Sequence, residues 1–231
     1  MTIDDGKSDV FTLLRKKFDL KQEVYTNTFQ VFQLFKSIMN EMADHYRNAY
    51  TKDKASAMFE FRDKSEFEVE LKFGSDILIF MMHTNVFEFS RDHEVMKTSY
   101  IREDAIRSYC GVINIYNFLS DSFKYNRVND IGYLIGRVFI NREKHYFIEG
   151  KREIGMLYNN FAQSLINNQS ARQILESAIR YTVNFDLLTP PYDAVKEVSV
   201  FDMQTTIDNI KLQTGKRLGF KFQADQEDVR L

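Results

Sequence analysis

One short stretch of the chain carries the residue types that metal-dependent chemistry needs. Glu70 and Lys72 are separated only by Leu71, in a segment where apolar and charged residues alternate. This alternation predicts a β-strand, and side chains at positions i and i+2 of a strand stand on the same face. A carboxylate beside an ammonium group can hold a divalent metal ion and activate a water molecule.

The Glu-x-Lys pattern resembles the second half of the catalytic motif of restriction-endonuclease-like nucleases. The resemblance implies an acidic residue on a preceding strand, for which Asp53 and Asp63 are the candidates. The match covers three residues, and any solvent-facing strand with alternating charges can produce it. We therefore interpret the charged row as a solvated strand face. A metal-dependent nuclease that uses Glu70, Lys72 and Asp53 remains the alternative.

The histidines and the cysteine form no complete catalytic or metal-binding pattern. The segment that begins at His93, H-E-V-M-K, starts like the zinc motif H-E-x-x-H but has Lys97 in place of the second ligand. Cys110 has no histidine near it in the sequence, and we predict a small buried hydrophobe. Glycine-rich phosphate loops and the G-x-S-x-G nucleophile motif are absent. We expect no metal ion, no cofactor and, on balance, no enzyme.

Two further places carry polar residues that are suited to binding. A loop between two predicted strands mixes charged, amide and aromatic side chains and includes Asp121, Lys124 and Arg127. Loops of this kind often carry binding residues. Arg137 lies among apolar residues of the following strand, where a guanidinium needs a carboxylate partner or marks a polar pocket. We favour the ion pair for Arg137 and take all four residues as binding candidates.

The elements that position these residues begin with a helical segment over residues 1–53. A short helix near residues 8–18 and a long one over residues 22–50 are expected, and the second contains no glycine or proline. The second helix would be about 40 Å long at 1.5 Å per residue, and its apolar residues repeat at heptad spacing. We favour a helix laid across a wide sheet, and the excess length leaves room for a homodimer seam.

Residues 54–150 change to a period of two, which predicts about six strands with a meander at the centre. Turns are expected at residues 63–65 and 74–76. Residues 151–222 are mainly helical, with helices near 154–166, 170–183 and 204–214. A strand or an extended piece is expected near 198–201, a strand near 218–222, and a frayed tail at 223–231. This order predicts one α+β domain: an antiparallel sheet of five to seven strands, packed by a long N-terminal helix and a C-terminal helical pair.

The amino-acid composition narrows the possible classes of function further. The 31 Lys+Arg and 33 Asp+Glu residues give a formal net charge of −2, which provides no general attraction to nucleic acid or to an anionic membrane. We expect no membrane span and no secretory signal, and a single cysteine fits a reducing cytoplasm. The sequence therefore predicts a non-catalytic binding or scaffold module that acts through protein contacts and forms a homodimer. Besides the nuclease, a small-ligand sensor with an aromatic-lined pocket is an alternative.

Overall fold

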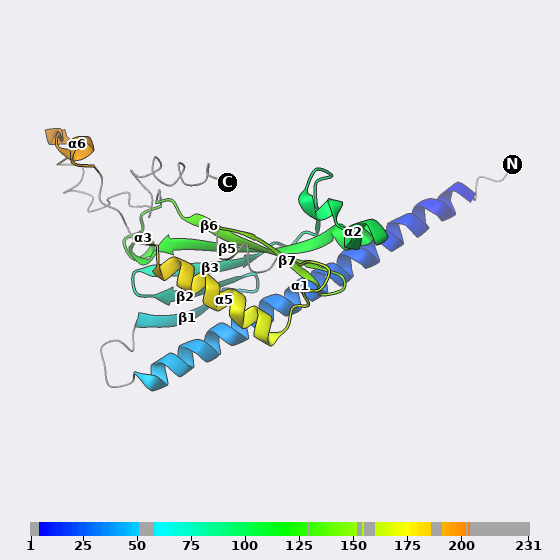
Figure 1. The fold of residues 1–231 in the computed structure, drawn as a ribbon, viewed down its shortest axis with the longest axis horizontal. Helices are drawn as coiled ribbons and strands as arrows, with labels where there is room; N and C mark the ends of the chain where they lie inside the picture. The colour runs from blue at the N-terminus through cyan, green and yellow to red at the C-terminus, as the bar shows by residue number, and fades with distance from the viewer. Residues whose placement is uncertain are drawn as a thin grey trace.

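The computed structural model describes residues 5–50, 58–128, 130–151, 154, 160–185, 191–201 and 203. Asp53, the start of the first predicted strand, and the elements predicted from residue 204 to the end lie outside these described residues. Within them, an antiparallel seven-stranded sheet is packed by a long N-terminal helix and a C-terminal helix, as the sequence predicts (Figure 1).

The N-terminal helix, α1, is one continuous helix of 45 residues, Asp5–Ala49. The prediction of two separate helices is wrong, because residues 19–22 (Asp-Leu-Lys-Gln) contain no glycine or proline that would interrupt the backbone hydrogen bonds. Its apolar stripe is buried against the sheet from Val24 to Ala43, with Phe32 and Phe35 fully covered. The part that precedes Val24 extends beyond the sheet (Figure 1).

The strands follow the spatial order β1-β2-β3-β5-β6-β7, and β4 also pairs with β5. Their bounds are β1 Phe59–Ser65, β2 Glu68–Phe73, β3 Asp76–Met82, β4 Phe87–Glu88, β5 Tyr109–Leu119, β6 Tyr133–Asn141 and β7 Tyr146–Gly150. All pairs are antiparallel, and the predicted meander is present because β1, β2 and β3 are neighbours in sequence and in space. The turn expected at residues 63–65 is displaced, because β1 continues to Ser65 and bends there at a register shift.

One face of the sheet packs on α1 and on α5, Asn168–Val183, and carries the main core. In this core the rings of Phe35 and Phe80 lie 5.2 Å apart. The opposite face is covered over one part by the segment that contains the short helices η2 Glu94–Lys97, α2 Ser99–Glu103 and η3 Ala105–Ser108. A second apolar cluster lies there, in which Tyr100 and Ile101 pack with Val112 and Phe139.

The C-terminal predictions need three corrections. Residues 160–166 form turns and a bridge from Leu165 to His145 instead of a helix, because their backbone groups bond to residues 144 and 146 beside β7. Residues 200 and 201 are helical, where a strand or an extended piece was expected, and they follow the short helix α6, Tyr192–Val195. α5 begins earlier than the predicted residue 170: its N-cap is Asn167, and Ser170 completes the capping box three residues later.

Candidate functional site

The Glu70 carboxylate is buried rather than solvated, which corrects the interpretation of β2 as a strand with one fully exposed face. Its side chain has two cations nearby: Arg62 Nη1 lies 3.9 Å and Lys64 Nζ 3.7 Å from the carboxylate oxygens. Ile79 is its buried cross-strand neighbour on β3. Because β2 has a strand on each side, neighbouring side chains cover a position that would be wet at a sheet edge.

Lys72 and Asp63, the described residues considered with Glu70 for a nuclease site, each lie beside an oppositely charged side chain. Lys72 Nζ lies 3.9 Å from a carboxylate oxygen of Glu60, and Asp63 accepts a 2.6 Å hydrogen bond from Lys36. Asp53 lies outside the described residues. Within the described parts of the chain, no group of three or more His, Cys, Asp or Glu side chains could hold a metal ion. A carboxylate between two cations is suited to ion pairing.

The loop candidates follow β5, where residues expected to be irregular form the short helix α3, Ser120–Lys124. The Lys124 ammonium lies 4.8 Å and the Arg127 guanidinium 5.4 Å from the centre of the Tyr125 ring. A hydrogen bond with Tyr125 raises the pKa of Lys124. Arg127 also lies 3.9 Å from the buried carboxylate of Asp130, so its charge is partly matched inside the loop. The structure thus brings Lys124 and Arg127 to one exposed ring, beside the exposed Asp121.

Arg137 forms the ion pair that its position predicts. Its guanidinium donates to the carboxylate of Glu149, the residue opposite it on β7. The other oxygen of Glu149 lies 2.6 Å from Nε2 of His93, whose Nδ1 accepts a hydrogen bond from the Val95 amide at 3.2 Å. Arg137 therefore lies across from the middle of β5, away from the loop that holds the other three candidates. Three distant segments build this cluster, so local sequence patterns do not reveal it.

A second polar network holds the turn between β6 and β7. The hydroxyl of Tyr100 donates to Glu143 at 2.7 Å, and Asn141 donates to the same hydroxyl at 2.8 Å. Burial raises the pKa of Tyr100, and the hydrogen bond to Glu143 adds to this effect. Burial acts to raise the pKa of Glu143, but hydrogen bonds from Tyr100 and Arg107 outweigh it and lower that pKa. Paired in this way, these groups stabilise the turn.

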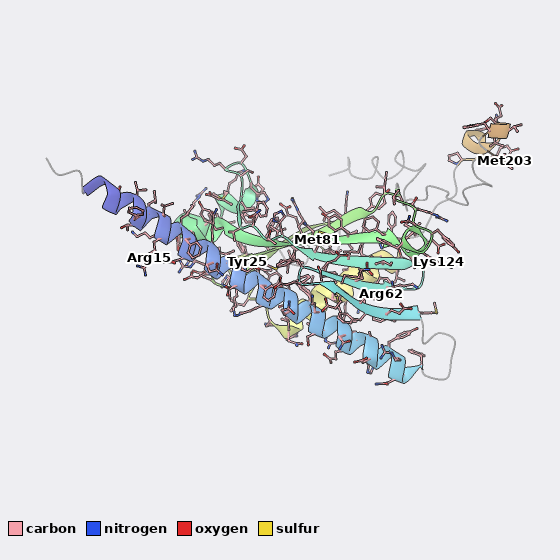
Figure 2. The ribbon with its side chains drawn as sticks, turned by 180° about the vertical axis from the view of Figure 1, so that it is seen from behind. Arg15, Tyr25, Arg62, Met81, Lys124 and Met203 are labelled. Carbon is pink, nitrogen blue, oxygen red and sulfur yellow. The ribbon has the colours of Figure 1, made fainter. Side chains whose placement is uncertain are left out.

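A row of exposed apolar side chains lies on residues 9–20 of α1, here called the α1 arm. Five of its side chains are between 54% and 66% exposed: Val10, Phe11, Leu13, Leu14 and Phe18. Phe11 and Phe18 precede the partly buried Tyr25 by fourteen and seven residues, so the arm continues the heptad rows of the buried stripe. Figure 2 shows Arg15 on this projecting part and Lys124 at the opposite end of the molecule.

A groove of about 550 Å³ runs between the α1 arm and the body of the protein. Leu13 and Leu20 line it from the arm, and Ile106 and Tyr109 line it from η3 and the start of β5. Lys17 bridges the two sides: its ammonium donates to the Tyr109 hydroxyl and lies 4.0 Å from the centre of that ring. The arm therefore presents apolar surface both on its free side and along this groove.

Comparisons of the chain with protein-family models, with curated proteins and with solved structures returned no match. No described helix is long and apolar enough to cross a membrane. The candidate surfaces are therefore compared by their geometry. The α1 arm combines exposed apolar side chains with a position at the margin of the sheet, where Lys17 contacts Tyr109, whereas the charged candidates are largely paired with neighbouring side chains.

Proposed function

We propose that the protein is a non-catalytic binding module that acts through protein–protein contacts, with the α1 arm as its contact surface and a second copy of the chain as the partner. The observation that carries the proposal is the row of half-exposed apolar side chains on a helix that projects past its own sheet. Monomeric proteins rarely expose large contiguous apolar patches, and such patches mark interaction sites. We place this activity in the cytoplasm, since a single cysteine allows no internal disulfide.

The amount of apolar surface fits a concentration-dependent dimer. The arm exposes two phenylalanines and three aliphatic side chains, each more than half exposed. Together they have on the order of 500 Å² of accessible apolar surface. A specific complex of standard size buries about 800 Å² on each partner. The arm alone falls below this value, so we expect association in the micromolar range that additional contacts along the neighbouring groove would strengthen.

An antiparallel arrangement of two arms suits the shape of the molecule. The apolar rows of the arm continue the rows by which α1 packs on the sheet, so two arms paired in parallel through these rows would bring both sheets to the same place. Antiparallel arms put the two sheets at opposite ends. In a register centred between residues 12 and 13, Phe11 of each copy meets Leu14 of the other.

Sedimentation velocity over a range of protein concentrations tests this proposal. We expect the wild type to shift from monomer to dimer and a Phe11→Glu/Phe18→Glu variant to remain monomeric. Thr12→Glu is the matched control, because Thr12 lies about 100° around the helix from Phe11 and about 120° from Phe18 and does not line the groove. It should dimerise like the wild type. A wild type that stays monomeric at several hundred micromolar would remove the homodimer from the proposal.

A further inference from the structure

His93 joins the segment that contains η2, α2 and η3 to strand β7. It lies directly before η2, and its ring contacts Phe89, with ring centres 4.7 Å apart, and Phe147 of β7, with ring centres 5.9 Å apart. The His93 side chain is 24% exposed. The ring is thus packed beside the second apolar cluster while solvent still reaches it.

The two ring nitrogens of His93 have different hydrogen-bond roles. Nδ1 accepts a hydrogen bond from the Val95 amide at 3.2 Å, so Nδ1 carries no proton. Nε2 lies 2.6 Å from Oε1 of Glu149, and because a carboxylate accepts, Nε2 is the donor. Together these contacts specify a neutral imidazole in the Nε2–H form. An imidazolium has a proton on both nitrogens and cannot accept the hydrogen bond from Val95.

The hydrogen bond to the Val95 amide lies at the centre of η2. Val95 is 4% exposed and is the residue by which η2 enters the second apolar cluster. Its carbonyl oxygen accepts hydrogen bonds from the amide and the hydroxyl of Thr98, at 3.2 and 2.7 Å. A buried amide that loses its acceptor is unfavourable unless the chain moves and the amide finds another. Loss of the acceptor on His93 therefore affects the whole turn.

Charged groups from three elements act on His93. The Glu149 carboxylate on β7 favours the imidazolium, whereas Arg137 on β6, which donates to the other oxygen of Glu149, opposes it. Glu94 on η2 has its pKa lowered mainly by a hydrogen bond from Lys97, and His93 adds to this effect. Histidine is the side chain that ordinarily changes its charge between about pH 5 and pH 8. The carboxylates near His93 thus each have a cation of their own.

We propose that His93 is a pH-dependent latch. Near neutral pH its bare Nδ1 closes the η2 turn, and in mild acid a proton from solvent binds Nδ1 and releases the Val95 amide, while Nε2–H keeps its bond to Glu149. The turn then opens between Phe89 and Thr98, over the second apolar cluster. This device lies on the body of the protein and does not depend on contacts made by the α1 arm.

Hydrogen exchange of backbone amides, followed by ¹H–¹⁵N NMR and corrected for the intrinsic pH dependence of exchange, tests the latch. Protection of the Val95 amide should fall about three- to tenfold from pH 8 to pH 5, which corresponds to the loss of one hydrogen bond. The ¹⁵N shifts of the His93 ring should show the Nε2–H form at pH 8 and titrate with the same midpoint. Constant protection of Val95, or an Nδ1–H ring at pH 8, would overturn the proposal.

Two asparagine variants assign the effect to one histidine. His93→Asn retains a side-chain acceptor for the Val95 amide and does not titrate, so protection of Val95 should be equal at pH 8 and pH 5. His83→Asn is the matched control, because Nδ1 of His83 also accepts from the amide two residues later, that of Asn85 at 3.0 Å. This control should keep the wild-type response of Val95. A pH response that persists in His93→Asn would refute the latch.

Glu149→Gln tests the charge that acts on His93. Glutamine keeps an acceptor for Nε2–H but removes the negative charge, so the midpoint of the Val95 response should fall by about one pH unit. An unchanged midpoint would contradict the pairing of His93 with Glu149. None of these substitutions touches the α1 arm, so all variants should sediment at pH 7 like the wild type. The latch and the dimer can therefore fail separately.

Discussion

Gly111 of β5 touches Thr28 of α1: a Cβ atom built on Gly111 would lie 2.1 Å from Thr28 Oγ1 and 2.7 Å from Thr28 Cβ. The Thr28 hydroxyl is itself fixed by a 2.7 Å hydrogen bond to the carbonyl oxygen of Val24. No side chain fits between the helix and the strand at this point. The absence of a side chain at residue 111 therefore sets how closely α1 approaches the sheet.

Gly111→Ala should lower the free energy of unfolding by about 2–3 kcal/mol, because the added methyl group forces the helix and the strand apart. Thr28→Ala in the same chain should recover part of the loss, since it removes Oγ1 but leaves the Cβ atom. Urea denaturation of the two single variants and the double variant measures the coupling between the sites. Strictly additive losses would show that the two residues do not meet.

Removing the buried Lys36 and removing its partner Asp63 should have different effects on the stability of the protein. Its ammonium donates to Asp63 Oδ1 and to the Ser65 carbonyl oxygen, each at 2.6 Å. Asp63→Ala should cost about 1–2 kcal/mol, because it leaves a buried charge with one partner fewer. Lys36→Met should be close to neutral, and the double variant should be more stable than Asp63→Ala alone. Thermal denaturation at constant salt compares them, and a double variant less stable than Asp63→Ala would contradict this view of the pair.

The capping box of α5 should have a measurable effect on stability. The Asn167 side chain accepts a hydrogen bond from the Ser170 amide at 3.0 Å, and the Ser170 hydroxyl accepts one from the Asn167 amide at 2.8 Å. Asn167→Ala should destabilise the protein by about 1 kcal/mol. The exposed neighbour Asn168 makes a suitable control, and Asn168→Ala should change stability by less than about 0.5 kcal/mol. Chemical denaturation checks both values, and equal losses would argue against the box.

Acid should weaken the network around Glu143. Its pKa in the folded protein is lowered from the ordinary value of 4.5. A carboxyl group with a lowered folded-state pKa stabilises the protein above the pKa of the unfolded chain, and this stabilisation is lost as pH falls through the folded-state pKa. Between pH 7 and pH 3 the wild type should therefore lose more stability than Glu143→Gln does. Parallel acid titrations, followed by circular dichroism, measure the difference, and identical pH profiles would contradict it.

Cys110 should be unreactive in the folded protein. It is 1% exposed, and burial raises the pKa of its thiol, so little of the reactive thiolate forms at neutral pH. A colorimetric thiol reagent should react slowly without denaturant and rapidly in concentrated urea. Rapid labelling of the native protein at the unfolded rate would show that the second apolar cluster opens readily.

The sequence predicts local structure well where one period dominates a segment. The alternation around Leu71 and the apolar run from Ile77 indicate β2 and β3, and the lone Cys110 is buried as expected. The interpretation of Glu70 as solvated is wrong, because its side chain is buried by the strands on either side of β2. The alternation of apolar and charged residues within β2 does not reveal these neighbours. Residues 160–166 have helical spacing, yet their backbone groups bond beside β7, so tertiary pairing outweighs local preference.

The candidate surfaces were only partly predictable for the same reason. Arg137 among apolar strand residues indicates an ion pair, but the identity of Glu149 as its partner follows from the register of β6 and β7. A groove of about 750 Å³ lined by Tyr46 of α1 and Ile179 of α5 exists because these two helices, far apart in the sequence, diverge over one sheet (Figure 1). The surplus length of the apolar stripe is visible in the sequence. The position of the sheet determines which end of α1 projects, and the sequence of the helix alone does not show this position.

α1 is one continuous helix, but different interactions stabilise the arm and the part that packs on the sheet. Isolated helices shorter than about 12–15 residues are marginal in water, and among the described residues the arm meets the body of the protein through Lys17 and the groove residues. Its helical state is propagated outward from the turns that the sheet holds at Val24 and Thr28. Amide protons along α1 should therefore exchange with solvent in a gradient, fastest near Val10 and slowest near Phe35, with no break in the helix to mark the change.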